Sequence, residues 1–396
     1  MIENPLQLLR EDAAPGTALT PERLLAAGRG RVRRRRAAIT GGVAAAVLVA
    51  TVGVAAFAAP GPTPRPPLAP SPRPAASLPT GSLPAEPDCR SSSLTVPGGG
   101  AIERVVVDPT GSWAAGLRAD HRGVVIWHDG EVSSTVADVD VTALAGISSG
   151  GVAAGTGPGP RALTFTGTHA TALTPPGGSS STQAFDINGA GDVVGAYGTP
   201  GGGQQAVEWR RSDPLHPRTL AVPAGESAAA LVIADDGTIG GYLGAATGRH
   251  RAHVWPADGP GRTLDPSTDP QTDTAIDGLG GGYAFDLGRT KGLPPPDRLP
   301  GMTPAPQVER WPLTPGSEDP VVLLLQPDDG GQDAAADGTL LINEGERAVL
   351  ERLHASTELP RPAGFTSVRA TSLNRNASVV GGVADGGPLL WRCGKG

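Results

Sequence analysis

Cysteine is almost absent from this 396-residue sequence, which contains only Cys89 and Cys393. The first 36 residues contain neither cysteine nor histidine, which excludes a zinc-binding module there. The seven histidines are scattered along the chain, and none belongs to an H-E-x-x-H motif. We therefore expect no metal and no cofactor.

Lysine is also rare, with only Lys291 and Lys395, so nearly all positive charge is arginine. Residues 1–88 carry ten arginines and six acidic groups. Residues 89–396 are left with 22 basic and 33 acidic groups, a formal net charge of −11. Because phosphate contacts dominate affinity for nucleic acid, such an acidic region is a poor match for it. We expect no nucleic-acid partner.

Long helical patterns are lacking because the 58 glycines and 41 prolines make up a quarter of the chain. The exception is the run from Ala37 to Ala59, which has no charge and only Thr40 and Thr51 as polar residues. At about 1.5 Å per residue, this run is long enough to cross the hydrocarbon layer of a membrane once. Six arginines stand between positions 29 and 36, so the positive-inside rule places the N-terminus in the cytoplasm.

A cleavable signal peptide is the alternative, because Ala56-Phe-Ala58 resembles a processing site. We favour a retained anchor, since the apolar run is longer than the hydrophobic region of a signal peptide, which has roughly 7–15 residues. Frequent prolines between Pro60 and Pro87 predict an extended spacer. The expected organisation is a cytoplasmic basic tail (1–36), a transmembrane helix (37–59), a proline-rich disordered linker (60–88) and an extracytoplasmic domain (89–396).

The outer domain contains a repeated tetrapeptide that ends, in six copies, in an aromatic residue. The copies are Val124 to Trp127, Ala162 to Phe165, Ala206 to Trp209, Ala252 to Trp255, Val308 to Trp311 and Pro388 to Trp391, with a degenerate copy at Ala348 to Glu351. Their ends are 38, 44, 46, 56, 40 and 40 residues apart, which gives seven units of about forty residues.

Each unit also contains a tight turn and a strand of small residues ahead of the tetrapeptide, as in Asn188-Gly-Ala-Gly191-Asp-Val-Val-Gly195. Asparagine, aspartate and glycine supply the positive φ angles that hairpin turns need. A final strand such as Arg218 to Val222 gives four strands per unit. Four strands in about forty residues are typical of a propeller blade. The sequence therefore predicts an all-β, seven-bladed β-propeller.

The seventh unit ends at Trp391-Arg-Cys393 without a fourth strand. Residues Ser92 to Val96, near the start of the domain, resemble the fourth strands of other units and would complete this blade. Cys89 would then meet Cys393 where the missing turn belongs. We predict a disulfide that closes a loop of about 300 residues in an oxidising compartment.

Two stretches resemble the extracellular HAF repeat, a WD40-like propeller unit that reads roughly A-x-x-I-N-x-x-G-x-V-V-G followed by A-F-x-W. They are Ala184 to Gly195 with Ala206-Val-Glu-Trp209, and Ser372 to Gly381 with Trp391. The resemblance implies a secreted or surface β-propeller and brings no catalytic residues. The arginine-rich, lysine-poor composition is typical of a GC-rich, actinobacterial genome.

No catalytic residue is predicted. Gly146-Ile-Ser148-Ser-Gly150 fits the G-x-S-x-G motif, but the motif requires a strand-to-helix turn, whereas a glycine-rich strand follows here. His250 and His253 are three residues apart and would face opposite sides of a strand, so they are not expected to share a metal.

One cluster of loops concentrates positive charge within the acidic domain. It lies between the second and third strands of units 1, 4 and 5, where one face of the propeller is expected. Its residues are Arg118, Asp120, His121, Arg122, Arg249, His250, Arg251, Arg289 and Lys291. Arginine forks suit carboxylates and phosphates, so the cluster predicts an anionic ligand such as a wall polymer. Ordinary solvated loops are the alternative.

The sequence thus favours a monomeric, single-pass protein of the cell membrane, anchored in lipid, with an extracellular propeller that binds or scaffolds. Its expected partner is a cell-wall polymer or a surface protein. Two alternatives stay open: a transmembrane sensor that signals through the tail, and an enzyme acting on wall glycan from the central funnel.

Overall fold

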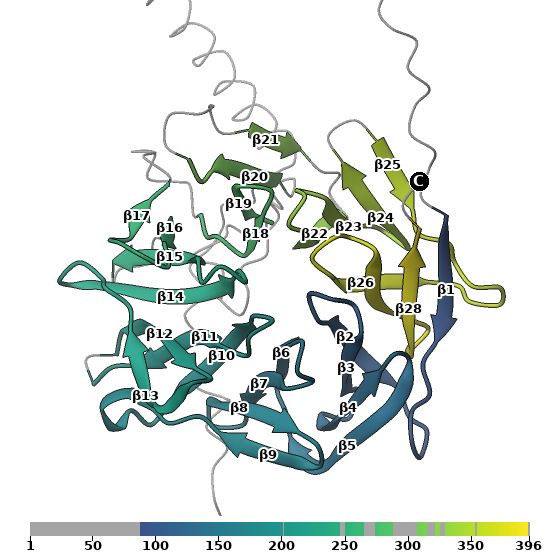
Figure 1. The fold of residues 1–396 in the computed structure, drawn as a ribbon, viewed down its shortest axis with the longest axis horizontal. Coiled ribbons are helices and arrows are strands. Elements are labelled where there is room, and N and C mark those ends of the chain that lie inside the picture. Colours follow the sequence, from purple (N-terminus) through teal and green to yellow (C-terminus); the bar gives the residue numbers. More distant parts are fainter. Residues whose placement is uncertain are drawn as a thin grey trace, which may run out of the picture. The chain divides into compact units, whose positions relative to one another are not determined.

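The computed structural model describes residues 88–200, 202–245, 250–264, 274–287, 307–314, 321–324, 329–352 and 355–394. Within these ranges the chain forms seven four-stranded antiparallel sheets around a central axis (Figure 1). The predicted all-β, seven-bladed β-propeller is confirmed. None of the described residues forms a helix that could span a membrane. The predicted tail and transmembrane segment, and the linker up to residue 87, lie outside the described residues.

The blades follow one another along the chain, and each is a meander whose strands we call A (innermost) to D (outermost) (Figure 1). Blade 1 contains β2 (Ile102–Val107), β3 (Trp113–Arg118), β4 (Arg122–His128) and β5 (Glu131–Asp140). Blade 2 contains β6 (Ala143–Ile147), β7 (Ala153–Gly157), β8 (Arg161–Thr166) and β9 (His169–Ala172). Blade 3 contains β10 (Thr182–Ile187), β11 (Val193–Gly198), β12 (Gln204–Arg210) and β13 (Asp213–Thr219). Blade 4 contains β14 (Glu226–Ile233), β15 (Ile239–Ala245), β16 (His250–Trp255) and β17 (Arg262–Thr263).

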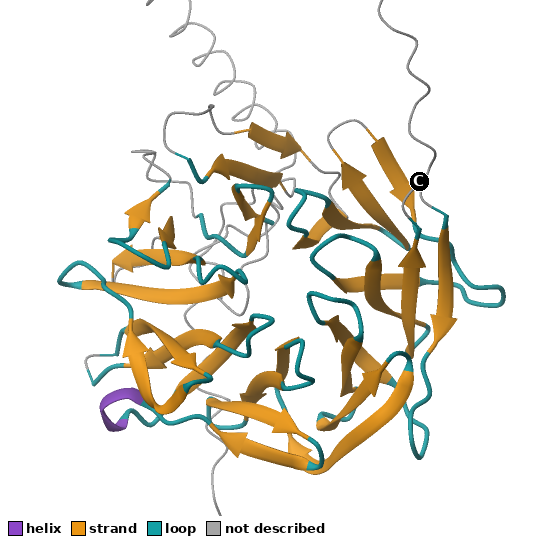
Figure 2. Cartoon of the chain, viewed as in Figure 1, coloured by secondary structure: helices purple, strands orange, loops and turns teal. Residues whose placement is uncertain are grey.

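The second half of the ring completes the set. Blade 5 contains β18 (Gly278–Gly280), β19 (Tyr283–Asp286), β20 (Gln307–Pro312) and β21 (Val321–Leu324). Blade 6 contains β22 (Asp329–Ala334), β23 (Leu340–Glu344), β24 (Arg347–Arg352) and β25 (Ala355–Glu358). Blade 7 contains β26 (Val368–Leu373), β27 (Val379–Ala384), β28 (Gly387–Cys393) and, as its D strand, β1 (Cys89–Ser93). A 3-10 turn (Pro176–Gly178) links blades 2 and 3 (Figure 2).

The hydrophobic core lies between neighbouring blades. In β4 every residue from Gly123 to Trp127 is buried, without the alternation of a half-exposed strand. Such a continuous buried run is expected when both faces of a sheet are covered. One apolar cluster, for example, joins Ile126 of blade 1 to Ile147 and Phe165 of blade 2.

In blades 1, 3 and 7 the tryptophan that marks the repeat anchors the chain as it enters the blade. The indole nitrogens of Trp127, Trp209 and Trp391 donate to backbone oxygens of Thr95, Thr174 and Pro360, at 2.7, 2.7 and 2.8 Å. Each acceptor lies just before the A strand of the same blade. All three indoles are buried, so the repeat marker has a structural role.

In the A–B turn of blade 3, the side chain of the first turn residue accepts hydrogen bonds from the backbone of the turn. Asn188 Oδ1 accepts the N–H groups of Gly191 and Asp192, at 3.0 and 2.9 Å. Gly191 has a φ of 95°, which explains the glycine in the repeated motif. In blade 7 this place is taken by Ala377, with a φ of 53°.

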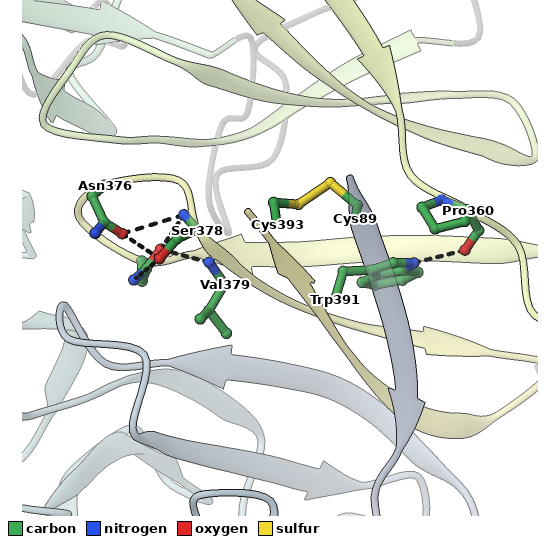
Figure 3. Close-up of a disulfide and its surroundings, with 8 residues drawn as sticks. Cys89, Pro360, Asn376, Ser378, Val379, Trp391 and Cys393 are labelled. Carbon is green, nitrogen blue, oxygen red and sulfur yellow. Dashed lines mark hydrogen bonds between the residues drawn. A yellow bond between two sulfur atoms is a disulfide. The ribbon is translucent and has the colours of Figure 1, made fainter. Parts of the chain in front are cut away.

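The N-terminal strand closes the ring as predicted, three residues earlier than expected. β1 begins at Cys89 instead of Ser92 and pairs with β28 along its whole length. A disulfide joins Cys89 to Cys393, as predicted (Figure 3). It lies where other blades have their C–D turn, so the covalent bond replaces a hairpin.

The D strand of blade 3 is also shifted from its predicted position. We expected Arg218 to Val222, whereas β13 spans Asp213–Thr219. It begins earlier because Asp213 already pairs with Arg210 across the C–D turn. The two prolines in β13, Pro214 and Pro217, are tolerated because the strand forms the outer edge of its sheet.

Candidate functional site: the axial cavity

The antiparallel meander fixes which loops meet at each end of the axis. Because the A strands are innermost and parallel around the ring, all A–B turns lie at one end and all B–C turns at the other. We call these the A–B end and the B–C end. The described residues of the predicted ligand-binding loops lie at the B–C end, between β3 and β4 and at the start of β16.

A cavity of about 330 Å³ lies at the A–B end of the axis. Residues from the A strands and A–B turns of all seven blades line it. Its charged lining residues are Arg104, Asp186, Asp235, Asp236, Asp277, Asp333 and Arg375. Five carboxylates and two guanidinium groups give this lining a formal net charge of −3. The volume is at the lower end of the range of small-molecule pockets, about 300–1,000 Å³.

Several polar groups of the cavity wall tie one blade to the next. Asp186 Oδ2 accepts the N–H of Ile233 at 2.9 Å, and Asp333 Oδ2 accepts the N–H of Leu373 at 3.0 Å. Each of these aspartates stands two residues before its A–B turn, next to a bulge in the A strand. The bulge turns the side chain toward the neighbouring blade. These carboxylates therefore have a structural role in addition to shaping the cavity.

One ion pair joins opposite sides of the cavity mouth. Arg375 Nη1, from the A–B turn of blade 7, lies 3.1 Å from Asp235 Oδ2, in the A–B turn of blade 4. Both residues line the cavity. The Asp235 carboxylate also accepts the N–H of Gly189, from blade 3, at 2.8 Å.

In blade 1 the predicted ligand-binding residues occupy one B–C loop and pair with nearby acids. Arg118 Nε lies 3.7 Å from Asp120, and Arg122 Nη2 lies 3.6 Å from Asp138. His121 Nε2 lies 3.2 Å from Glu103. The arginines of this loop therefore sit among carboxylates of their own blade.

The other predicted ligand-binding residues do not join that loop. His250 and Arg251 are in blade 4, three blades away around the ring. Arg251 Nη2 lies 2.6 Å from Glu226, and the His250 ring is 4.1 Å from that of Tyr242. Arg249, Arg289 and Lys291 lie outside the described residues. The proposed anion site stays a prediction, and the described part of it is split between two loops.

His253 is buried on the opposite side of β16 from His250. Its Nδ1 lies 3.2 Å from Thr263 Oγ1, and its ring is 4.6 Å from that of Trp255. Burial, reinforced by the positive charge of Arg251, lowers the pKa of His253 to about 4. His253 is thus neutral at neutral pH and belongs to the core.

The G-x-S-x-G motif forms an A–B turn, as expected. Ser148 is buried, and its Oγ accepts the N–H of Val152 at 3.2 Å. No helix follows it, since β7 begins at Ala153. Among the side chains described, no three His, Cys, Asp or Glu residues are grouped as metal ligands.

The charged residues of the cavity were not predicted from the sequence. Asp186 and Asp333 occupy the same repeat position, two residues before an A–B turn, and Ser372 occupies it in blade 7. An alignment of the seven units on their turns would have shown this recurrent polar position. Arg375 carries no such signal, because the equivalent position of other A–B turns is not recurrently charged: it holds Pro109, Ser149, Gly189, Asp235 and Ala336.

Comparison with known proteins supports the fold. No family model and no curated protein matches the chain. Among solved structures, a catalytically inactive variant of virginiamycin B lyase from Staphylococcus aureus with quinupristin is similar with a TM-score of 0.51 and 11% identity, over 77% of this chain and 99% of that chain. The selenomethionine-substituted lyase is similar with a TM-score of 0.50 and 13% identity, over 78% of this chain and 99% of that chain. The β-propeller domain of Cps50 (Swd1) from Myceliophteria thermophila has a TM-score of 0.44 and 12% identity, over 78% of this chain and 99% of that chain. At such identities the likeness shows the fold alone, and the HAF resemblance stays a prediction.

Proposed function

We propose that this protein is a membrane-tethered, extracytoplasmic binding module whose ligand occupies the axial cavity. The observation that carries the proposal is that all seven blades contribute residues to one cavity of about 330 Å³. A ligand there would contact residues spread over the whole domain. Concave sites with a few convergent polar groups are the usual form of small-molecule sites.

The structural role of the cavity carboxylates favours binding over catalysis. Asp186 and Asp333 each accept a backbone N–H from the next blade, so these carboxylates hold neighbouring blades together. A general acid or base must instead be placed to exchange a proton with a substrate. We therefore place the enzyme alternative second.

The tether rests on the apolar run at residues 37–59 and the arginine cluster before it. It is tested by expressing the full chain and extracting membranes with alkaline carbonate. We expect the protein to stay in the pellet at full length, with a protease-accessible propeller outside the cell. A soluble form cut after residue 58 would show a signal peptide instead.

The cavity is tested with the full chain in detergent, screened against small wall-derived amino sugars and peptides by saturation-transfer NMR. Ala336 is exposed at the cavity mouth, and Ala336→Trp would fill the entrance. Ala190 is exposed on another A–B turn outside the cavity lining, so Ala190→Trp is the matched control. Hits should be lost in Ala336→Trp and kept in Ala190→Trp. Absence of hits, or hits that survive Ala336→Trp, would contradict the proposal.

A further inference from the structure

The A–B turns at the cavity mouth are linked to one another by backbone hydrogen bonds. Ala336 N donates to Arg375 O at 2.8 Å, and Arg375 N donates to Pro109 O at 3.2 Å. The Arg375 backbone is thus held between blades 6 and 1. Its side chain alone reaches across the mouth to Asp235.

The two partners of this ion pair are not equally fixed. The Asp235 side chain is 26% exposed and is oriented by the N–H of Gly189 on its other oxygen. The Arg375 side chain is 61% exposed. Because an exposed ion pair contributes little stability and arginine gains rotamer freedom on release, the guanidinium group can leave at low cost. The carboxylate would stay in place.

The remaining lining determines which charge would replace it. Without the Arg375 guanidinium, the charged residues of the cavity wall are five aspartates and Arg104. A carboxylate or phosphate entering there would face an excess of negative charge. A cationic group would find the oriented Asp235 carboxylate and a favourable field.

We infer that the ligand of the axial cavity carries a cationic group, an amine or a guanidinium, which replaces the Arg375 guanidinium on Asp235. This inference rests on the proposed function, since it requires that the cavity binds a ligand. Arg375 then acts as a resident substitute for the ligand's cation. It also excludes neutral molecules that cannot displace it.

The test compares two probes of nearly equal shape, n-butylguanidinium and neutral n-butylurea, by NMR titration of the full chain in detergent. We expect the cation to bind about tenfold more tightly, the difference between a charge-assisted and a neutral hydrogen bond. Asp235→Asn should remove this preference. Asp236→Asn is the matched control, because it removes one charge from the same turn and leaves the partner of Arg375 intact.

Arg375→Gln is the second variant and does not depend on Asp235→Asn folding. Removing the competing guanidinium should tighten n-butylguanidinium binding by about two- to fivefold. Weaker binding in Arg375→Gln, equal binding of the two probes, or equal losses in Asp235→Asn and Asp236→Asn would overturn the inference. Failure of the proposed function is distinct, because the screen would then give no hits, or hits that persist in Ala336→Trp.

Discussion

Cys89 lies directly opposite Cys393 in the sheet of blade 7, with their Cα atoms 3.9 Å apart, although the two residues are separated by 304 positions in the sequence. The bond joins the first strand of the domain to its last. It therefore covalently closes the ring in blade 7, where the two ends of the propeller meet.

Replacing both cysteines with serine should destabilise the domain strongly. In the chain-entropy model, a loop of this length contributes about 5 kcal/mol to the free energy of unfolding. The measurement is urea unfolding of the double variant against wild type. Arg90→Ser with Arg392→Ser is the matched control, because these residues form the adjacent pair in the same register. A double cysteine variant as stable as the control pair would contradict the expectation.

Trp391→Phe tests the indole anchors. The variant leaves the Pro360 carbonyl without the indole donor and makes a small cavity, so we expect a loss of about 2–3 kcal/mol. Phe165 already occupies the equivalent position in blade 2, where Phe165→Leu should cost less because no such bond is lost. Chemical unfolding checks both. Equal losses would mean that packing alone determines the effect.

The buried His253 predicts a pH dependence of stability. Its folded pKa, about 4, is below the ordinary value of 6.5, so the unfolded chain binds the proton more readily. The contribution of this group is complete above pH 6.5, falls between pH 6.5 and 4, and is constant below pH 4, with a total loss of about 2 kcal/mol. Urea midpoints of wild type and His253→Gln should converge as the pH falls through this window. If the urea midpoints of the two proteins kept a constant difference over this pH range, the lowered pKa of His253 would be contradicted.

Asn343 tests the contacts between blades. Its side-chain amide donates to Ala370 O and accepts from Ala370 N, at 2.9 and 3.0 Å, which joins blade 6 to blade 7. Asn343→Leu leaves two buried backbone groups unpaired and should cost about 2–4 kcal/mol. Thr156→Val, which breaks the similar contact to Ala184 between blades 2 and 3, should cost the same or less. An Asn343→Leu variant as stable as wild type would show that the Asn343 contact does not stabilise the packing of blade 6 on blade 7.

Much of the architecture could be predicted from the sequence because it is local and repeated. The repeated tetrapeptides, six of them ending in an aromatic residue, predicted all seven C strands, and the turn motifs predicted the A–B hairpins. Strand ends were less well predicted, as β1 and β13 show. A strand ends where its pairing partner ends, which a single segment does not reveal.

The residues of the candidate site could not be predicted from the sequence in the same way. The sequence already assigned the loops with Arg118 and Arg251 to units 1 and 4, and the structure adds that each arginine lies beside an acid of its own blade. Asp235 and Arg375, 140 positions apart, form the ion pair at the cavity mouth. Their meeting depends on how seven blades close around an axis.

The sequence by itself determined the blade count, the strand order and the pairing of Cys89 with Cys393, because hydrophobic periodicity, turn chemistry and a missing last strand are properties of short segments. Only the tertiary structure decided which polar groups line the axial cavity and which ion pair spans its mouth. Those contacts are made between different blades, and their geometry is set by the closure of the ring.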